Sequence, residues 1–248
     1  MRLLILGGTT EASALARAVE GWADLDPILS LAGRTENPVL PPIPYRTGGF
    51  GGVDGLKAYL TGEKIDAVID ATHPFAAQMS ANAAEACGAL NIPLALFTRA
   101  AWRPVPGDRW TMAADMAAAA RALGDTPRRV FLTIGSLQLA VFAPAPQHHY
   151  LVRSIDPPDA AIALPDHRLI LARGPFTVEE ETTLMRDEVI DALVTKNSGG
   201  KATAAKLAAA RALNIEVIMV ERPKPPDVPA FESLDAITAW ALAHRPTP

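Results

Sequence analysis

The sequence predicts an α/β protein made of two open, mostly parallel Rossmann-like βα domains with a ligand cleft between them. Short apolar runs rich in β-branched residues alternate with alanine-rich amphipathic stretches along nearly the whole chain. Nearly continuous apolar strands separated by helices are typical of a parallel sheet that is covered on both faces. This alternation breaks once, in the segment TRAAWRPVPGDRW (residues 98–110), whose prolines and glycine indicate a domain boundary.

Nine segments are predicted strands and seven are predicted helices. The strands are residues 2–6, 27–32, 67–71, 93–97, 129–133, 149–154, 168–172, 191–195 and 216–220. The helices are residues 11–19, 53–60, 75–90, 112–123, 178–188, 202–213 and 234–243. We therefore expect a first domain over residues 1–98 and a second over residues 99–248. A TIM barrel suits the length, but nine strands and the single break favour two open sheets.

Composition and charge narrow the classes of function. The 248 residues are 49% hydrophobic and 20% charged, with a net charge of −4, so we expect neither nucleic acid nor a membrane as a partner. The single cysteine, Cys87, allows no disulfide framework and is expected to be buried; the histidines show no ligand spacing with acids, so no metal is expected. Without a signal segment or an apolar run of roughly 20 residues, we expect a cytoplasmic protein. A monomer is the simplest expectation for its oligomeric state.

The first predicted strand runs straight into a glycine turn and a helix, in the segment LILGGTTEA. Nucleotide-binding α/β domains place their phosphate loop here, because glycines allow close backbone approach and the helix N-terminus offers free N–H groups. The predicted cofactor contacts in this turn are Gly7, Gly8, Thr9, Thr10 and Glu11. The full G-x-G-x-x-G fingerprint is absent, so an ordinary tight turn with Thr10 capping the helix is the alternative.

The ends of the second and third strands carry further candidates. Arg34 and Thr35 follow the second strand, where an arginine accommodates the 2′-phosphate of NADP and an acid would select NAD. A solvated surface arginine is the alternative for Arg34. Thr72, His73 and Pro74 follow the third strand, and His73 suits an acid or a hydrogen bond to a cofactor, with a structural role as the alternative. These turns together favour NADPH over NADH.

The segment TKNSGGK (residues 195–201) sets two glycines against a lysine at a predicted strand-to-helix turn. A P-loop, G-x-x-x-x-G-K-[ST], would need a glycine where Thr195 stands and a hydroxyl where Ala202 stands. A nucleoside-triphosphate loop is therefore rejected. What remains is a strand-end turn in the second domain that is rich in hydrogen-bond donors and ready to face a ligand.

These segments together resemble the precorrin-6A reductase family of cobalamin (vitamin B12) biosynthesis. The resemblance is carried by LILGGTTEA, AGRT, DATHPFA, FTRAAW, TIGS, ARGPF and TKNSGG, which occur in order over almost the whole chain. It implies an NADPH-dependent reductase that adds a hydride and a proton to one double bond of precorrin-6A, giving precorrin-6B. A sister branch of the family acts on the cobalt-containing macrocycle, so the metal state of the substrate stays open.

The substrate that the resemblance implies is a large ring with many carboxylates, which requires apolar walls and several cationic donors. Turns of the second half supply such groups at strand ends. The predicted substrate contacts are Arg153, Ser154, Arg173, Gly174, Lys196, Gly200 and Lys201. Lys201, Lys196 and His73 are candidates for electrostatic or acid roles, with water as an equal candidate for the proton donor. The predicted contacts to the reactive end of the cofactor are Asn197, Ser198 and Gly199.

Two alternatives belong to other classes of protein. A precorrin methyltransferase with an α/β fold would be supported by an acid at the end of the second strand, where Arg34 stands instead. A non-catalytic NADP-binding sensor of the Rossmann type would need the first half of the chain, but not the basic turns of the second half.

Overall fold

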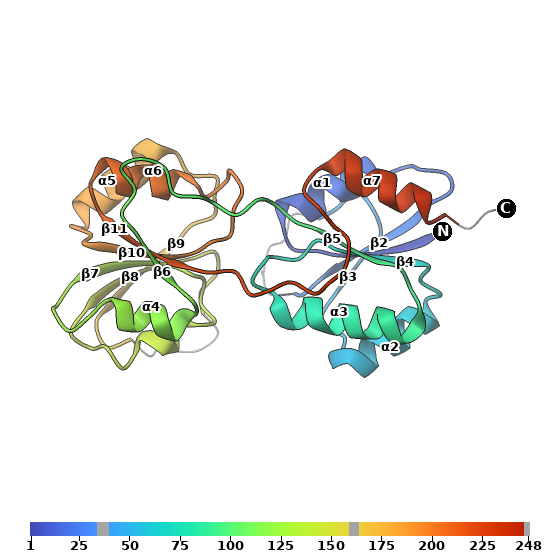
Figure 1. Cartoon of the computed structure of the whole chain (residues 1–248), viewed down its shortest axis with the longest axis horizontal. Coiled ribbons are helices and arrows are strands. Elements are labelled where there is room, and N and C mark those ends of the chain that lie inside the picture. The colour runs from blue at the N-terminus through green and yellow to red at the C-terminus, as the bar shows by residue number, and fades with distance from the viewer. Residues whose placement is uncertain (34–39, 159–163, 246–248) are drawn as a thin grey trace. The chain divides into compact units, whose positions relative to one another are not determined.

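The computed structural model describes residues 1–33, 40–158 and 164–245, which fold into two compact units (Figure 1). Unit 1 comprises Met1–Ala100 and Pro223–Pro248, and unit 2 comprises Ala101–Arg222. The boundary expected from the sequence, after residue 98, lies two residues earlier, and the expected second domain includes everything that follows it. The structure differs because the chain returns to unit 1 after residue 222.

Unit 1 is a six-stranded parallel sheet with helices on both faces. Its elements are β1 (Arg2–Leu6), α1 (Thr10–Ala18), β2 (Asp26–Leu31), β3 (Tyr45–Thr47), α2 (Gly52–Gly62), β4 (Ala67–Asp70), α3 (Ala77–Leu90), β5 (Leu94–Phe97), β12 (Ala230–Phe231) and α7 (Leu234–Ala243). The strand order is β12-β5-β4-β1-β2-β3, and every neighbouring pair is parallel. Read from β3, this is the order 3-2-1-4-5-6 of dinucleotide-binding folds.

Unit 2 repeats this architecture but has a different connection between two of its central strands. Its elements are β6 (Trp110–Ala113), α4 (Met116–Ala122), β7 (Arg129–Thr133), the 3₁₀ helix η1 (Leu139–Phe142), β8 (His149–Ser154), β9 (His167–Leu171), α5 (Val178–Asp187), β10 (Ala192–Lys196), α6 (Ala205–Ala212) and β11 (Glu216–Val220). The strand order is β6-β11-β10-β7-β8-β9, again parallel throughout. A 3₁₀ helix stands between β7 and β8, where unit 1 has α1 between β1 and β2.

The two sheets exchange their outer strands. β6 follows β5 along the chain but pairs with β11, and β12 follows β11 along the chain but pairs with β5. Each sheet therefore receives its sixth strand from the segment that leaves the other sheet. Two separate six-stranded sheets exclude the TIM barrel.

Apolar side chains bury both faces of each sheet, as continuous apolar strands require. In unit 1, Figure 1 shows α1 beside α7 on one face and α2 beside α3 on the other. Leu3 and Ile5 of β1 pack toward α1 and α7, whereas Leu4 packs toward α2 and α3, and all three are fully buried. In unit 2, Phe131 of β7 and Leu193 of β10 pack with helices α5 and α6. Each such side chain contributes roughly 1.5–3 kcal/mol of transfer free energy.

All nine predicted strands and all seven predicted helices are present; four of the strands and the last helix have the predicted bounds, and the others are shifted at one or both ends. The sequence did not predict β3, β6, β12 and η1. β3 and β12 are too short to produce an apolar period, having three and two residues. The predicted helix 112–123 ran into β6; the true helix begins at Met116, because the Asp115 side chain accepts the N–H of Ala118 as its cap. Two other helices begin later than predicted, α3 at Ala77 and α6 at Ala205.

Candidate functional site

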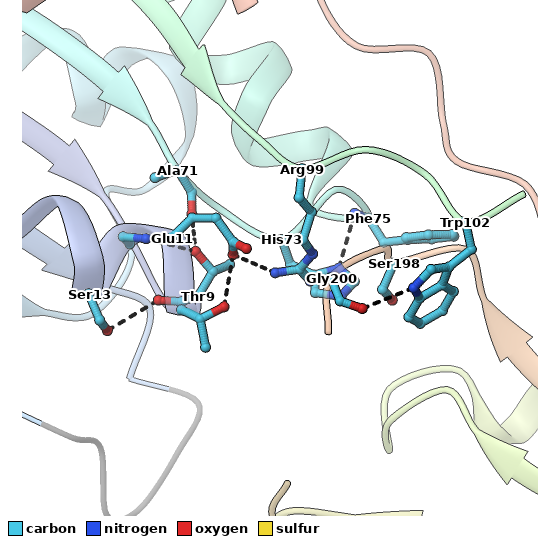
Figure 2. Close-up of polar contacts among 12 residues, drawn as sticks. Thr9, Glu11, Ser13, Ala71, His73, Phe75, Arg99, Trp102, Ser198 and Gly200 are labelled. Atoms are coloured by element: carbon cyan, nitrogen blue, oxygen red, sulfur yellow. Dashed lines mark hydrogen bonds and ion pairs between the residues drawn. The ribbon is translucent and has the colours of Figure 1, made fainter. Parts of the chain in front are cut away.

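In unit 1 the predicted residues gather at the carboxyl ends of β1 and β4, the point where the strand order reverses. Open parallel sheets bind ligands at such a switch point. The turn after β1 and the turn after β4 are tied together by Thr9, whose Oγ1 donates to the carbonyl oxygen of Ala71 at 2.7 Å (Figure 2). Two turns that are far apart in the sequence therefore form one rigid edge.

The two adjacent glycines of the first turn serve different purposes. A Cβ on Gly7 would lie 2.7 Å from Cδ1 of Leu29, so Gly7 lets the turn pack against β2. Gly8 has φ +108, in the region that favours glycine, and a Cβ there would meet nothing within 4 Å. Gly8 is also exposed. The backbone at Gly8 is thus open to close approach by a ligand, as a phosphate loop requires.

The helix that follows is capped by Thr9 and not by Thr10, which corrects the alternative reading of this turn. Thr9 is extended, at φ −128 and ψ 167, and its Oγ1 accepts the N–H of Ala12 at 3.1 Å. The Thr9 carbonyl accepts the hydroxyl of Ser13 at 3.2 Å. Thr10 is the first helical residue and is exposed, and its hydroxyl donates to Oε2 of Glu11 at 3.1 Å.

Glu11 lies in the first turn of α1, where its charge compensates the helix dipole. Its Oε2 also pairs with Nη1 of Arg99 at 2.5 Å, and both side chains are more than four-fifths buried (Figure 2). Arg99 lies just beyond β5 and was not among the predicted site residues. The pair brings a cation to the edge where an anionic cofactor is expected, and it offsets the repulsion that Glu11 alone would exert.

The turn after β4 is held by a buried carboxylate. Asp70 is 3% exposed, and its Oδ1 accepts both the N–H of Thr72, at 3.0 Å, and the Thr72 hydroxyl, at 2.6 Å. Its Oδ2 accepts the hydroxyl of Ser80 on α3 at 2.5 Å. The proton of the Thr72 hydroxyl is therefore used within the protein, and toward a ligand Thr72 can act only as an acceptor.

His73 and Pro74 come next, ahead of the helix. The Nδ1 atom of His73 accepts the N–H of Phe75 at 3.2 Å, so the neutral ring carries its proton on Nε2. The His73 carbonyl accepts the N–H of Ala76 at 2.7 Å. The predicted helix 75–90 would start directly after Pro74, but α3 begins only at Ala77, so Pro74 lies in the preceding turn.

The predicted 2′-phosphate contacts, Arg34 and Thr35, lie outside the described residues. Gly33, the last described residue before them, has φ +71, and the neighbouring strand β3 carries Arg46. Arg46 Nη1 donates to Ser30 Oγ and to the Gly48 carbonyl, both at 2.8 Å. Its guanidinium also lies 4.1 Å from the centre of the Phe50 ring. Arg46 thus fixes the glycine-rich loop after β3.

In unit 2 the turn after β10 is held by Trp102. The side-chain amide of Asn197 is fully engaged: its Oδ1 accepts the N–H of Trp102 at 2.8 Å and its Nδ2 donates to the Trp102 carbonyl at 3.1 Å. The indole Nε1 of Trp102 donates to the carbonyl of Gly200 at 2.9 Å (Figure 2). Asn197 is 7% exposed, so it shapes the turn from inside.

A second clamp on the same turn comes from Arg222, at the end of unit 2. Its Nε donates to the Asn197 carbonyl at 2.7 Å, and its Nη2 donates to the Ser198 carbonyl at 2.9 Å. Gly199 and Gly200 adopt φ +68 and +80, which completes a tight reversal that L residues resist. The clamps use backbone carbonyls and the Asn197 side chain, so they hold the turn without engaging the Lys201 ammonium group, which is exposed.

The two lysines of this turn are more exposed than the buried side chain of Asn197. Lys201 is exposed and Lys196 is half-buried at the end of β10. Helix α6 begins at Ala205, three residues later than predicted, and its cap, Ala204, offers no side-chain hydrogen bond. The ammonium groups, and not a helix N-terminus, are therefore the groups of this turn that suit an anionic ligand.

Of the two other predicted basic segments, the one at the end of β8 is buried. Arg153 is 8% exposed, its Nη2 pairs with Oε1 of Glu181 at 2.8 Å, and Ser154 is 9% exposed. The guanidinium of Arg153 lies 3.9 Å from the centre of the Phe176 ring. Arg153 therefore supports the following turn from below.

The turn after β9 contains Arg173, which is exposed, and Gly174. A Cβ on Gly174 would lie 3.2 Å from the carbonyl oxygen of Ala202, and the Phe176 N–H donates to that same oxygen at 3.3 Å. The turns after β9 and β10 are therefore packed together, with Arg173 and Lys201 both exposed.

The support residues Arg99, Trp102, Glu181 and Arg222 were missed by sequence reasoning. The sequence signal for Arg99 and Trp102 was their position in the segment where the strand–helix alternation breaks. Cys87 is buried as expected, and burial, with a smaller contribution from Asp70, raises the pKa of its thiol to about 12. The described residues contain no group of three or more His, Cys, Asp or Glu side chains that could hold a metal ion. Within the same ranges, no helix combines the length and apolarity needed to cross a membrane.

Comparisons with known proteins agree over the whole chain. A family model described as precorrin-6x reductase CbiJ/CobK matches residues 2–242. Precorrin-6A reductase of Rhodobacter capsulatus is 51% identical over 247 residues, covering 100% of this chain and 98% of the relative. The Mycobacterium tuberculosis H37Rv precorrin-6A reductase is 45% identical, covering 96% of each chain. Cobalt-precorrin-6A reductase of Priestia megaterium is 29% identical, covering 90% of this chain and 91% of the relative.

A solved structure titled CobK precorrin-6A reductase superposes with a TM-score of 0.93 at 51% identity. The superposition covers 100% of this chain and 98% of that chain. At this identity and coverage, the two-unit fold with its exchanged outer strands is shared with that protein.

Proposed function

The chain belongs to the precorrin-6x reductase family, and on that premise we propose that it uses NADPH to reduce one double bond of precorrin-6A, giving precorrin-6B, in cobalamin biosynthesis. The observation that carries this proposal is the full-length match to precorrin-6A reductases. The switch-point geometry of unit 1 and the basic turns of unit 2 support the proposal, because their groups suit a dinucleotide and a polycarboxylate.

The first turn of unit 1 fits the phosphates of a dinucleotide. Gly8 leaves its backbone open, and the first N–H groups of α1 point out of a capped helix start. Thr9, Thr10 and Gly7 hold or border this turn, and Arg99 neutralises Glu11, which would otherwise repel an anionic cofactor. We assign the 2′-phosphate of NADPH to Arg34 and Thr35, from their position after β2.

The turn after β4 is the next part of the proposed cofactor site. Thr72 can accept a hydrogen bond from a cofactor hydroxyl, and His73 can donate one from Nε2. Pro74 has no N–H to satisfy, which suits an exposed turn. When bound, NADPH supplies the hydride, so the chain itself needs no nucleophile.

The turns of unit 2 fit a polycarboxylate macrocycle. Arg173 and Lys201 are exposed cations on two turns that pack together. Lys196, at the end of β10, is half-buried. Guanidinium and ammonium groups bind carboxylates by charge-assisted hydrogen bonds. Ser198, Gly199 and Gly200 shape the same turn, with Gly174 closing the contact and Arg153 and Ser154 beneath it.

The proposed reaction requires the protein to orient NADPH and the macrocycle, to hold a cation near the ring, and to provide a proton donor. A positive charge near the ring favours electron flow into the conjugated system, and Lys201 or Lys196 can supply it. The proton comes from one of these lysines, from His73 through Nε2, or from water. The clamped turn would further increase the rate by holding the ligand in the reactive orientation.

We further propose that the substrate is the metal-free macrocycle. The relatives named precorrin-6A reductase share 51% and 45% identity with this chain, whereas the relative named cobalt-precorrin-6A reductase shares 29%. The sequence left this choice open.

The test is incubation of the purified protein with precorrin-6A and NADPH under anaerobic conditions. We expect loss of the near-ultraviolet absorbance of NADPH and formation of a ring reduced by two electrons, identified by mass spectrometry. Parallel reactions with NADH and with cobalt-precorrin-6A are expected to be much slower. If NADPH binds but is never oxidised, the non-catalytic sensor becomes the better reading. Equal dissociation constants for NADPH and NADH would remove the role given to Arg34.

A further inference from the structure

Unit 2 buries a lysine that the proposed reaction does not use. Lys206 lies in the first turn of α6 and is 4% exposed. A buried ammonium group is costly unless other groups compensate its charge. Its charged neighbours come from two different elements, Arg153 of β8 and Glu181 of α5, and its Nζ lies 5.2 Å from the centre of the Trp102 ring.

With Lys206, these neighbours form a cluster of two basic side chains and one carboxylate. Arg153 and Glu181 pair at 2.8 Å and neutralise one another, and Arg153 lies between the rings of Phe131 and Phe176 at 4.9 and 3.9 Å. The second carboxylate oxygen of Glu181, Oε2, is buried and has no hydrogen-bond partner among the described residues. A protonated Lys206 leaves the cluster with one net positive charge, and a neutral Lys206 leaves none.

The face of the Trp102 indole receives this charge, and its other contacts lead to the turn after β10. The indole Nε1 donates to the Gly200 carbonyl, while the backbone N–H and carbonyl of Trp102 make the two bonds with the Asn197 side chain. A cation over an aromatic face is attracted by the ring quadrupole, most strongly where water is excluded. The charge state of Lys206 is therefore connected to the turn through a single side chain.

We propose that Lys206 is a positioning residue for the turn 197–201: its ammonium group, supported by Arg153 and Glu181, holds the Trp102 indole in the orientation in which its Nε1–H fixes the Gly200 carbonyl. This inference rests on the proposed function only in the statement that the turn holds the ligands. Because Lys206 is 4% exposed, the proposal gives it no direct contact with substrate or cofactor.

The titration of Lys206 makes the proposal measurable. Burial, and to a smaller degree Arg153, lowers the pKa of Lys206 to about 7, while Glu181 acts in the opposite direction. The attraction to Trp102 is present below this pKa and is lost as the pH rises through it. The folding stability has the opposite sign, because the folded state binds this proton less tightly than the unfolded state: stability from this group falls as the pH drops toward about 7 and is higher in alkaline solution.

The first experiment follows tryptophan emission of the ligand-free protein as a function of pH. We expect a transition with a midpoint near neutral pH that disappears in Lys206→Met and in Trp102→Phe, because the charge at the indole is gone or the reporter is gone. Lys57→Met, a half-buried lysine of α2, is the matched control and keeps the transition. Glu181→Gln moves the midpoint to lower pH, since Glu181 raises the pKa of Lys206. An unchanged transition in Lys206→Met overturns the proposal.

The second experiment measures reduction of precorrin-6A by the full chain across the same pH range. Below the midpoint, Lys206→Met is expected to lose roughly ten- to hundredfold in kcat/KM, the loss expected from a displaced catalytic group, with no change in the Kd of NADPH. Above the midpoint the two proteins converge. A loss that is equal at all pH values, and that follows the loss of thermal stability, would show a merely structural lysine and overturn the proposal. If the native protein reduces no precorrin-6A, the proposed function fails, and the emission experiment still tests Lys206.

Discussion

The two units share one strand order but use its switch point differently. In unit 1 the strand β1 leads through a left-handed glycine, Gly8, into an α-helix that is capped and tied to the neighbouring turn by Thr9. In unit 2 the corresponding strand β7 leads through another left-handed glycine, Gly135, into a 3₁₀ helix, and the donor-rich turn stands one strand away, after β10. The same topology thus presents a helix N-terminus in one unit and clamped surface cations in the other.

This difference teaches that strand order alone does not assign a ligand to a sheet. A helix start with an open glycine suits phosphates, because it offers N–H groups and a dipole. A turn whose carbonyls are held by Trp102 and Arg222 offers lysine ammonium groups on a clamped backbone, which suit carboxylates that are spread over a large ring. This assignment of ligands to the two units can be tested by comparing each substitution at a proposed site residue with a matched substitution elsewhere.

The largest effect is expected for Gly8→Val. Both Gly8 and Gly135 are exposed, have positive φ and leave open space at a Cβ, so valine costs each about 1–3 kcal/mol of strain without a clash. Only at Gly8 is the side chain expected to block a phosphate, raising the Kd of NADPH roughly a hundredfold, or about 2.7 kcal/mol. Titration with NADPH and thermal unfolding of both variants separate strain from binding. Equal losses of affinity in Gly8→Val and Gly135→Val would place no special function on the first turn.

The next effect concerns the exposed cations of unit 2. Arg173→Ala should raise the KM for precorrin-6A roughly tenfold, since a charge-assisted hydrogen bond contributes about 1.5–3 kcal/mol. The Kd of NADPH should stay nearly unchanged. Arg186→Ala, which removes an exposed arginine from α5, is the matched control and should leave both values as they are. Loss of NADPH affinity alone in Arg173→Ala would reverse the assignment of ligands to the two units.

The sequence predicted most of the elements because burial on both sheet faces leaves apolar runs that can be read locally. It could not predict which sheet receives β6 and β12, because that choice depends on pairing partners more than 100 residues away. Candidate site residues could be found in the sequence because the same apolar runs show where each strand ends. Their roles were not: Arg153 looks like a surface donor until Glu181, on a later helix, is seen to bury it, and Asn197 is engaged by Trp102, 95 residues earlier.

The smallest effect compares two threonine caps. Thr9 caps α1 and Thr177 caps α5, where Thr177 also forms a capping box with Glu180, so removal of either hydroxyl should cost about 1 kcal/mol of stability. Thr9 alone also donates to Ala71 and so joins the turns after β1 and β4. Thr9→Ala should therefore weaken NADPH binding a few-fold, whereas Thr177→Ala should leave it unchanged. The check is a pair of NADPH titrations beside denaturant unfolding of both variants. If the affinity for NADPH follows stability equally in both, the tie between the two turns of unit 1 does not prepare the site, and the open backbone at Gly8 is the feature that distinguishes its edge.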